Sequence, residues 1–444
     1  MVIKLPKNVT KIIKTFHTSG YEAYAVGGCI RDTILGREPE DWDITTSAKP
    51  EDMKKLFKRT IDTGIEHGTV TIMIGSEGYE VTTYRIDGEY VDHRRPKEVT
   101  FTSNLMEDLK RRDFTINAMA YNEENGLIDI FGGIEDIKAR VIRCVGDPRQ
   151  RFDEDALRIM RAVRFAAQLN YAVEEETKRA MCEYSSALET ISEERIQVEL
   201  VKTVTSDNPG YLELAYETNV MTAIMPEFDA IMHTTQNNPH HCYDVGHHTL
   251  WAMKSIGNHR WLRLAMLFHD MGKAPSKTTD ERGIDHFYRH AIQSEIIAKK
   301  ILKRLKFDNE TIYYVTKLVR HHDDRMIPPN EYTVRRAVCR IGRDIFPLIL
   351  QVQAADMAAQ SNYMRKEKME NLNIITQCYD NIIENGDCIG LDMLAIKGSD
   401  LIDMGVPEGK RIGELLEKLL QIVLETPECN TKEFLERKVQ ELIL

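Results

Sequence analysis

A stretch near the start of the chain, residues 24–44, constrains the fold most, because it is typical of strand, glycine turn, short helix, loop and second strand. The apolar run at its start ends at Gly27 and Gly28, where a backbone can approach a ligand unobstructed by Cβ atoms. Arg31 and Asp32 follow, and we expect them to open a helix whose N-terminal amides suit a phosphate chain. The stretch therefore predicts a phosphate-binding turn between two strands.

Two aspartates, Asp41 and Asp43, flank Trp42 at the start of the second expected strand. Residues two apart on a strand project from the same face. Two carboxylates held that close raise one another's pKa unless a cation lies between them. Oxygen ligands of this kind suit Mg²⁺, which commonly binds one or two carboxylates plus substrate phosphates. A glycine turn and a pair of solvated aspartates are each common alone, so the prediction rests on their combination.

At this spacing the glycine pair and the two aspartates resemble the active-site signature of the nucleotidyltransferases related to DNA polymerase beta. The order Gly-Gly-x-x-Arg-Asp ahead of Asp-x-Asp is similar to the class II branch, which comprises tRNA CCA-adding enzymes and bacterial poly(A) polymerases. The resemblance implies an α/β head with a polymerase-beta-like mixed sheet. It also implies that Gly27, Gly28 and Arg31 bind a nucleoside triphosphate while Asp41 and Asp43 hold Mg²⁺.

A β-hairpin is predicted from residues 70–74 and 79–85, which are β-branched and bounded by glycine-containing turns. Glu80 lies on its second strand and is the candidate third carboxylate beside Asp41 and Asp43. An ordinary exposed strand residue would fit the same position equally well.

A mobile loop is expected next, because residues 85–98 have turn and charge content but little apolar periodicity. Asp92, Arg94 and Arg95 lie at its centre. In the resembled family, members that add only CC lack the flexible loop that permits the switch to ATP. The intact sequence here therefore favours addition of the complete CCA.

Residues 108–120 are apolar from Phe114 onward and have a helical period. We expect Arg112, Asp113 and Asn117 at one end of this helix, facing a ribose or triphosphate, although a capping and salt-bridge cluster would look the same. The stretch resembles the family motif Arg-Arg-Asp-Phe-x-x-Asn-Ala, which implies nucleotide binding.

A further helix is predicted over residues 152–167, with Glu154, Asp155 and Arg158 along one edge at spacings of three and four. A surface salt bridge worth about 0.3–0.5 kcal/mol is the plain interpretation. The trio resembles the family's Glu-Asp-x-x-Arg motif, which implies that Asp155 and Arg158 read the incoming base. Arg161, one turn further on, belongs to the same predicted nucleotide site.

Base reading of this kind has a chemical basis. Cytosine and adenine each present an amino donor beside a ring-nitrogen acceptor, whereas uracil and guanine present a carbonyl beside a ring N–H. The Asp155 acceptor and the Arg158 donor match the first pair only. A wrong base leaves buried polar groups unpaired at about 1–3 kcal/mol each. Glu154 can hold the Arg158 guanidinium in plane, while Arg195 and Glu199 resemble the last neck motif and are expected to position helices.

The second half of the chain carries imidazoles and carboxylates on consecutive expected helices. They resemble the HD phosphohydrolase superfamily in spacing, and mixed nitrogen and oxygen ligands suit a divalent transition metal. A retained scaffold without turnover is the alternative. The minimal set is His248, His269, Asp270 and Asp356, and His290 with either His321 or His322 completes a two-metal site.

The length of 444 residues predicts two to four domains. Strand signals almost vanish beyond residue 148, so an elongated all-α region that includes an HD-type domain is expected after the head. The predicted divisions are a catalytic head at 1–145, a base-recognising neck at 146–230, an HD-type domain at 231–360 and a tRNA-binding tail at 361–444. In the tail, Lys397, Lys410 and Arg411 are candidate phosphate contacts.

The net charge of −11 argues against a protein that coats nucleic acid indiscriminately, but it leaves room for local RNA contacts. No run approaches 18 uncharged apolar residues, so no membrane span is expected. The eight cysteines are scattered without a C-x-x-C pair, which favours reduced thiols in a cytoplasm. Nothing in the sequence sets the oligomeric state.

Together these features predict a Mg²⁺-dependent tRNA nucleotidyltransferase that adds CCA to the tRNA 3′ end from CTP and ATP. The alternatives within the family are an enzyme that adds only CC or only A, and a poly(A) polymerase, whose own basic signature after the aspartates is not seen. From other classes, an HD phosphohydrolase with a vestigial head, or an RNA-binding scaffold, stays open. The intact pair Asp41 and Asp43 beside an intact base-reading helix speaks against both.

Overall fold

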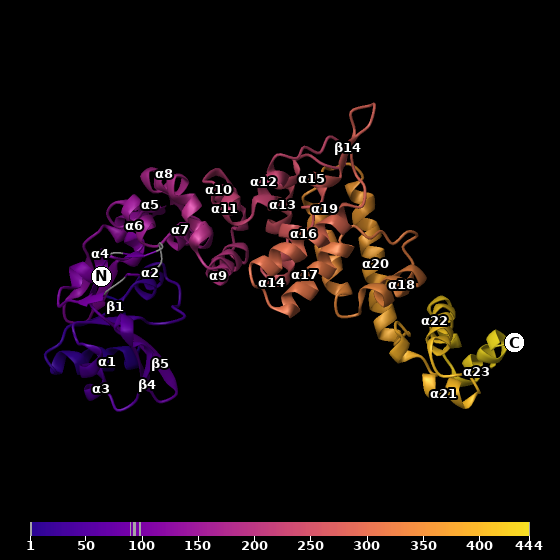
Figure 1. Cartoon of the computed structure of the whole chain (residues 1–444), viewed down its shortest axis with the longest axis horizontal. Helices are drawn as coiled ribbons and strands as arrows, with labels where there is room; N and C mark the ends of the chain where they lie inside the picture. Colours follow the sequence, from indigo (N-terminus) through magenta and orange to yellow (C-terminus); the bar gives the residue numbers. More distant parts are fainter. Residues whose placement is uncertain (1, 89, 92–94, 97–98, 444) are drawn as a thin grey trace. The chain divides into compact units, whose positions relative to one another are not determined.

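The computed structural model describes residues 2–88, 90–91, 95–96 and 99–443. Two compact units make up the chain, Met1–Pro226 and Glu227–Leu444 (Figure 1). The finer division into head, neck, HD-type domain and tail stays a prediction. In the described part of the chain, no helix is both long enough and apolar enough to cross a membrane.

A mixed seven-stranded sheet forms the centre of the head, with strand order β11-β10-β1-β2-β5-β4-β3. Strand β1 runs antiparallel to β10 and β2, and β2 runs parallel to β5. The predicted hairpin is confirmed as β4 and β5, with Thr71 opposite Glu80. The strands are β1 (Ala23–Val26), β2 (Ile44–Thr46), β3 (Thr60–Gly64), β4 (Thr69–Ile74), β5 (Glu77–Thr83), β10 (Met119–Asn122) and β11 (Gly126–Asp129).

Short helices surround the sheet, and their apolar residues enter its core. In α1, four residues at helical spacing are buried, which places one face of that helix against the sheet. Tyr24 and Val26 of β1 pack with Tyr84 and Leu109 in a second cluster. The helices are α1 (Lys7–Thr18), α2 (Gly28–Ile34), α3 (Pro50–Leu56), α4 (Leu105–Lys110) and α5 (Gly133–Ala139).

Two short strand pairs occupy the region of the predicted loop. Strand β6 (Arg85–Asp87) pairs with β9 (Val99–Phe101), and β7 (Tyr90–Val91) pairs with β8 (Arg95–Pro96). Asp92 and Arg94 lie outside the described residues, and Arg95 begins β8. The role of this segment as a loop that permits a nucleotide switch stays a prediction.

The prediction of a helix over residues 108–120 is wrong. Helix α4 ends at Lys110, a single 3-10 turn follows at Thr115–Asn117, and the apolar run then becomes strand β10. All four residues of β10 are buried, so both faces of the strand are covered and the alternation of apolar and polar residues that marks a half-exposed strand is lost. Periodicity alone cannot tell such a strand from a buried helix.

The helix predicted over residues 152–167 is interrupted. Helix α6 (Pro148–Glu154) ends before Asp155, whose backbone is extended at φ −144° and ψ 101°, and α7 (Leu157–Leu169) begins two residues later. The Asp155 carboxylate accepts a hydrogen bond from the Leu157 amide at 3.1 Å. Aspartate side chains compete with the helical backbone in this way, which favours a break between helices.

Helices complete the first unit and build most of the second. Those of the first unit are α8 (Glu175–Tyr184), α9 (Glu193–Val204), α10 (Leu212–Glu217) and α11 (Val220–Ile224), with a parallel strand pair β12 (Val141–Ile142) and β13 (Ala172–Val173). Those of the second are α12 (Pro226–Met232), α13 (Val245–Lys254), α14 (Arg260–Phe268), α15 (Lys273–Ser276), α16 (His290–Arg304), α17 (Asn309–His321), α18 (Glu331–Ile341), α19 (Phe346–Ala358), α20 (Arg365–Asn385), α21 (Gly398–Asp403), α22 (Lys410–Glu425) and α23 (Lys432–Ile443), with a hairpin of β14 (Lys277–Thr279) and β15 (Asp285–Phe287). This confirms the predicted change from a mixed sheet to a helical region.

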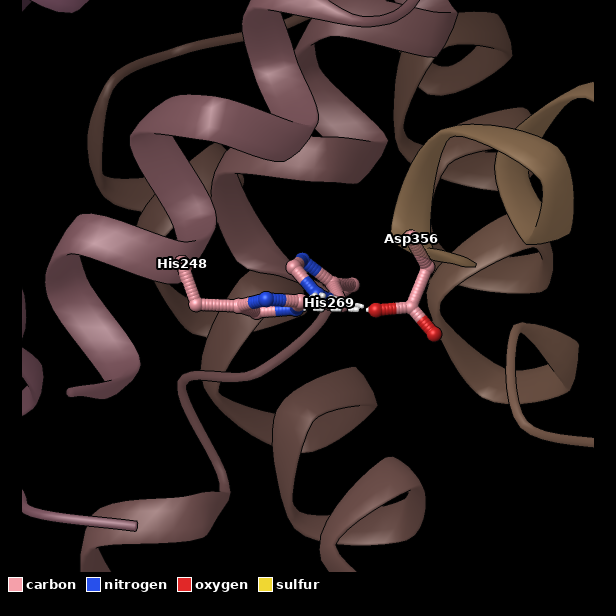
Figure 2. Close-up of side chains that lie close together, drawn as sticks. All are labelled: His248, His269 and Asp356. Carbon is pink, nitrogen blue, oxygen red and sulfur yellow. Dashed lines mark hydrogen bonds and ion pairs between the residues drawn. The ribbon is translucent and has the colours of Figure 1, made fainter. Parts of the chain in front are cut away.

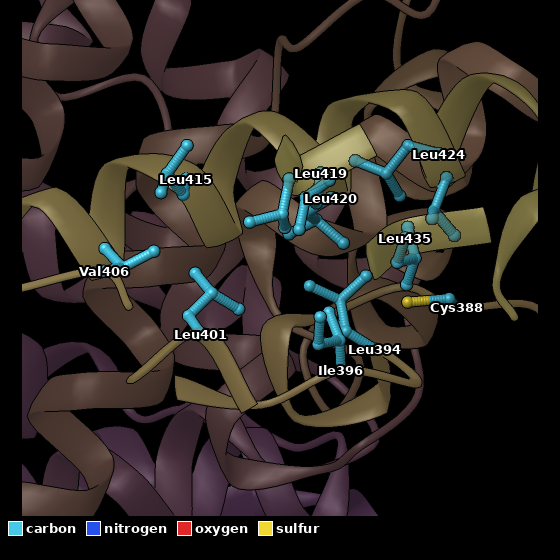
Figure 3. Close-up of a cluster of buried hydrophobic side chains, with 12 residues drawn as sticks. Cys388, Leu394, Ile396, Leu401, Val406, Leu415, Leu419, Leu420, Leu424 and Leu435 are labelled. Atoms are coloured by element: carbon cyan, nitrogen blue, oxygen red, sulfur yellow. The ribbon is translucent and has the colours of Figure 1, made fainter. Parts of the chain in front are cut away.

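Helix α19 is central to the second unit, because it contacts α13, α14, α17 and α20. Its sequence is apolar on most sides, as expected for a helix surrounded by others. A separate cluster of leucines and other apolar residues holds α21, α22 and α23 together near the C-terminus (Figure 3). Lys397, Lys410 and Arg411, the predicted phosphate contacts, are exposed at the starts of α21 and α22.

Candidate functional site

Three carboxylates gather where β2 and β5 begin to pair. Asp43 directly precedes β2, and its carbonyl accepts a hydrogen bond from the Val26 amide at 3.0 Å. Because Ile44 lies opposite Val81 in the parallel pair, the preceding positions Asp43 and Glu80 are neighbours. The sequence placed Asp41 and Asp43 at the start of a strand, and the structure puts them just ahead of it.

The electrostatics of this group favour a bound cation. Although Asp43 keeps contact with solvent, the protein around it desolvates the carboxylate, and Asp41 and Glu80 add negative charge. Desolvation and these charges raise the pKa of Asp43 to about 6, against the opposing charge of Arg112. Crowded carboxylates of this kind fit Mg²⁺, which relieves their repulsion and prefers oxygen ligands.

The glycine turn lies beside the same group. Gly27 has φ 85°, and a Cβ added to it would lie 3.1 Å from Arg112 Nη1. The backbone conformation therefore requires glycine here, and the missing Cβ also leaves room for the Arg112 guanidinium. Helix α2 begins at Gly28, so Arg31 lies in its second turn and does not open it as the sequence predicted.

A buried chain of polar side chains connects the predicted nucleotide residues. Arg31 donates to Asp32 at 2.9 and 2.8 Å and to Asn117 Oδ1 at 2.6 Å. Asn117 donates to Asp113 Oδ1 at 3.1 Å, and the other oxygen of Asp113 accepts from Arg161 at 2.7 Å. The structure thus brings four of the predicted nucleotide residues, Arg31, Asp113, Asn117 and Arg161, into one network that also includes Asp32.

Two residues of this region had no predicted role. The guanidiniums of Arg31, Arg161 and Arg164 lie 5.0, 5.3 and 4.2 Å from the centre of the Phe165 ring. Arg164 is buried and donates to Glu199 at 3.0 Å. Burial and the nearby Arg161 charge lower the pKa of Arg164 to about 10. The spacing of three between Arg158, Arg161 and Arg164 on an otherwise apolar helix is a signal that could have identified Arg164.

We expect Glu199→Ala to lower the free energy of unfolding by about 3–5 kcal/mol, because it leaves the Arg164 guanidinium buried without its carboxylate. Glu194→Gln, an exposed change on the same helix, should lower it by less than about 0.5 kcal/mol. Denaturant unfolding of the two variants and the parent measures the difference. Equal midpoints for all three proteins would contradict a structural role for the pair.

The three residues of the predicted base-reading trio do not all contact one another: Arg158 pairs with Glu154, and Asp155 pairs with Arg195. Arg158 is buried and donates to Glu154 at 2.6 Å and to the Arg151 and Arg111 carbonyls at 3.0 and 2.9 Å. Asp155 instead accepts from Arg195 of α9 at 2.8 Å. The trio therefore does not share one helix edge, and the ion pair between Arg158 and Glu154 is not a surface salt bridge. Glu154 contacts Arg158 as an orienting residue would.

The predicted metal ligands of the second unit lie in two groups, within each of which the ligand atoms are within 4.8 Å of one another. His248 on α13, His269 after α14 and Asp356 on α19 form the first, and their side chains point toward one another in Figure 2. The second consists of Asp270, His290 and His322. Between the alternatives left by the sequence, His322 joins the group, whereas His321 bonds Asp324 at 2.8 Å.

The four imidazoles are oriented as metal ligands commonly are. The Nδ1 atom of each ring faces a backbone carbonyl oxygen, which can only accept a hydrogen bond. Each neutral ring must therefore carry its proton on Nδ1, which leaves a free lone pair on Nε2. The Nε2 atoms then approach one another closely, at 3.3 Å between His248 and His269 and 3.2 Å between His290 and His322. The carbonyl acceptors are those of Ala359, Met266, Phe287 and Val319, at 3.3, 2.7, 2.9 and 2.7 Å.

Asp270 lies between the two groups. Its Oδ2 is 3.2 Å from His269 Nε2 and 3.5 Å from His248 Nε2, and its Oδ1 is 3.4 Å from His290 Nε2. Burial opposes a positive charge on His269, but Asp270 and Asp356 outweigh it and raise the pKa of His269 to about 10. The nitrogen and oxygen donors gathered here fit divalent metal ions.

Three family models match the chain. They are the "Poly A polymerase head domain" over residues 23–143, the "Probable RNA and SrmB- binding site of polymerase A" over 170–232, and the "tRNA nucleotidyltransferase domain 2" over 278–439. Over these three segments the chain is similar to the poly(A) polymerase and tRNA nucleotidyltransferase family. This similarity implies dependence on a divalent metal ion. None of the three descriptions names an HD domain, although the third match spans His290, His322 and Asp356, so the relation of the His and Asp groups to HD phosphohydrolases stays a prediction.

Curated relatives that match part of the chain are CCA-adding enzymes. That of Levilactobacillus brevis is 57% identical over 198 residues, which is 45% of this chain and 50% of the relative. That of Enterococcus faecalis is 53% identical over 196 residues, 44% of this chain and 48% of the relative. The chain thus spans about half the length of the curated relatives it matches.

Solved structures of the family match over the whole chain. The Bacillus stearothermophilus CCA-adding enzyme in complex with CTP has a TM-score of 0.72 and 29% identity, covering 99% of both chains. The Thermotoga maritima CCA-adding enzyme complexed with tRNA has a TM-score of 0.60 and 21% identity, covering 100% of both, and shows the fold alone. The predicted fold class and family resemblance are confirmed.

Proposed function

We propose that this chain is a tRNA nucleotidyltransferase that adds C, C and A to the tRNA 3′ end from CTP and ATP. The observation that carries the proposal is the carboxylate group of Asp41, Asp43 and Glu80 beside the glycine turn and Arg112. The names of its relatives, including one solved with CTP, support the same activity. The cytoplasmic location predicted from the cysteine pattern is part of this proposal.

In the proposed reaction, the tRNA 3′-oxygen attacks the α-phosphorus, the bond to the bridging oxygen breaks, and pyrophosphate leaves. Asp41 and Asp43, with Glu80 beside them, would hold Mg²⁺, which when bound lowers the pKa of the 3′-hydroxyl and neutralises charge on the leaving group. Gly27 admits the triphosphate to the backbone, and Arg112 places a positive charge next to it. Positioning and fixed charge then supply most of the barrier reduction.

The ribose and base would contact residues of the polar network and the neck. Asn117 and Arg31 hold one another at 2.6 Å and are fixed before a nucleotide arrives. Arg158 is held by Glu154, and Asp155 by Arg195, so each candidate base reader already has a partner that orients it. We propose that an incoming C or A pairs with Asp155 and Arg158, and that the tail from residue 361 contacts the tRNA.

Selection of the base tests this assignment. Asp155→Ala should weaken discrimination against UTP and GTP by about ten- to a hundredfold, because one matched hydrogen bond of about 1–3 kcal/mol is lost. Arg158→Ala should also relax selection, but it removes a buried ion pair and should lower stability as well. The measurement is incorporation of all four nucleotides into tRNA that ends before CCA, with Asp153→Asn as the control two residues away. Unaltered preference with a lower melting temperature for Asp155→Ala would show a purely structural residue.

For the second unit, we propose a two-metal phosphohydrolase. The observation that favours it is the pair of ligand groups bridged by Asp270, with the Nε2 atoms of four histidines facing two carboxylates. His248, His269 and Asp356 would hold one divalent transition metal ion, and His290 and His322 a second. Such ions activate water for phosphoester cleavage. Lys273 lies 2.7 Å from Asp270 and balances its charge.

A further inference from the structure

We infer that Gln360, fixed in turn by Lys368, positions Asp356 for metal binding in the second unit. The inference rests on the proposed metal centre and adds two residues that are not themselves ligands. Gln360 lies two residues beyond the end of α19, and Lys368 is the fourth residue of α20. Both side chains are half-buried.

The two oxygens of Asp356 have separate partners. Oδ1 lies 2.8 Å from His248 Nε2 and 3.7 Å from His269 Nε2, on the side of the ligand group. Oδ2 accepts a hydrogen bond from Gln360 Nε2 at 2.8 Å. The hydrogen bond holds the carboxylate in the rotation that presents a single oxygen to the metal position.

The orientation of the Gln360 amide follows from its two partners. Lys368 Nζ donates to Gln360 Oε1 at 2.6 Å. An ammonium group can only donate and an ionised carboxylate can only accept, so Gln360 must turn its oxygen to Lys368 and its nitrogen to Asp356. Lys368 thereby excludes the flipped amide, which would point an oxygen at the carboxylate.

Open space beside Asp356 explains why the carboxylate needs this support. Two cavities of about 400 and 360 Å³ adjoin it, and Asp356, Gln360 and Lys368 line both. Packing therefore does not fix the outer oxygen on that side, and a hydrogen bond must do so. The same end of α19 also fixes a second ligand, because the Ala359 carbonyl accepts from His248 Nδ1 at 3.3 Å.

The test is a Mn²⁺ titration by calorimetry on the full chain, stripped of metal, in an Asp41→Asn and Asp43→Asn background that removes the carboxylate site of the head. Gln360→Met should lower Mn²⁺ affinity by about ten- to a hundredfold, the usual effect of losing a group that orients a ligand. Lys368→Met should lower it less, and should add nothing when combined with Gln360→Met, because both act through one amide.

Gln353→Met is the matched control, because Gln353 is a half-buried glutamine of α19 that lines one of the same cavities but donates to the Asp324 carbonyl. It should leave Mn²⁺ affinity unchanged. Unchanged Mn²⁺ affinity in Gln360→Met relative to the parent background, or an equal loss of Mn²⁺ affinity in Gln353→Met, would overturn the positioning role while leaving the metal centre in place. A parent protein that binds no Mn²⁺ at all would overturn the metal centre and the positioning role together.

Discussion

Asp43→Asn should reduce nucleotide incorporation into tRNA by about a thousandfold or more, because it removes a charged ligand from the group that stabilises the developing charge. Asp41→Asn should have an effect of the same order. Binding of tRNA, measured by gel shift, should persist in both variants. The matched control is Glu40→Gln, an exposed neighbour of Asp41, which should retain full activity.

Asp43→Asn should also change the melting temperature, and the sign of the change follows from the pKa of Asp43. The pKa of Asp43 is raised from its ordinary value of about 4 to about 6 in the folded protein, so its ionised form disfavours folding, and this cost grows as the pH rises from about 4 to about 6 and is complete above that range. Without metal, Asp43→Asn should therefore melt at a higher temperature than the parent at pH 8, and the difference should vanish as the pH falls toward 4. Substantial incorporation by Asp43→Asn under Mg²⁺ would contradict the assignment of this carboxylate.

His269→Ala should abolish hydrolysis of bis(p-nitrophenyl) phosphate and lower bound transition metal, while nucleotide incorporation stays at the level of the parent. The reason is that His269 Nε2 lies 3.2 Å from the bridging Asp270 and 3.3 Å from His248 Nε2, at the centre of the first ligand group. Metal is measured by mass spectrometry on protein purified without chelators.

A sharper comparison uses two adjacent histidines. His322→Gln should lose hydrolysis because His322 belongs to the second ligand group, whereas His321→Gln should retain it because His321 bonds Asp324. If neither the parent nor His321→Gln carried transition metal or cleaved the diester, the second unit would be a scaffold without turnover.

The local features that sequence predicts well are those with a short-range cause. The glycine turn at Gly27, the hairpin of β4 and β5 and the carboxylates ahead of β2 each depend on a few neighbouring residues. The predictions that failed concern features that depend on the tertiary environment. Strand β10 has a helix-like apolar pattern only because both of its faces are buried, which no local window reveals.

The candidate sites show the same difference between features with a local cause and features set by tertiary contacts. Spacing suggested that Glu154, Asp155 and Arg158 share a helix edge, but the break at Asp155 directs its carboxylate to Arg195, a residue 40 positions away. The choice between His321 and His322 was likewise undetermined, because adjacent positions on a helix differ by about 100° and the packing of α17 decides which one faces inward. Arg164 and Phe165 were missed because Glu199, which pairs with Arg164, and Arg31, which lies over the Phe165 ring, come from other elements.

The most direct test of the central claim is stepwise extension of tRNA transcripts that end before CCA, after the first C, and after CC, each with one labelled nucleotide at a time. The proposed function predicts that CTP extends the first two substrates, that ATP extends only the third, and that extension stops at the completed CCA. Runs of A on any substrate would identify a poly(A) polymerase. Extension by CTP alone or by ATP alone would identify a partial enzyme, and either outcome would contradict complete CCA addition.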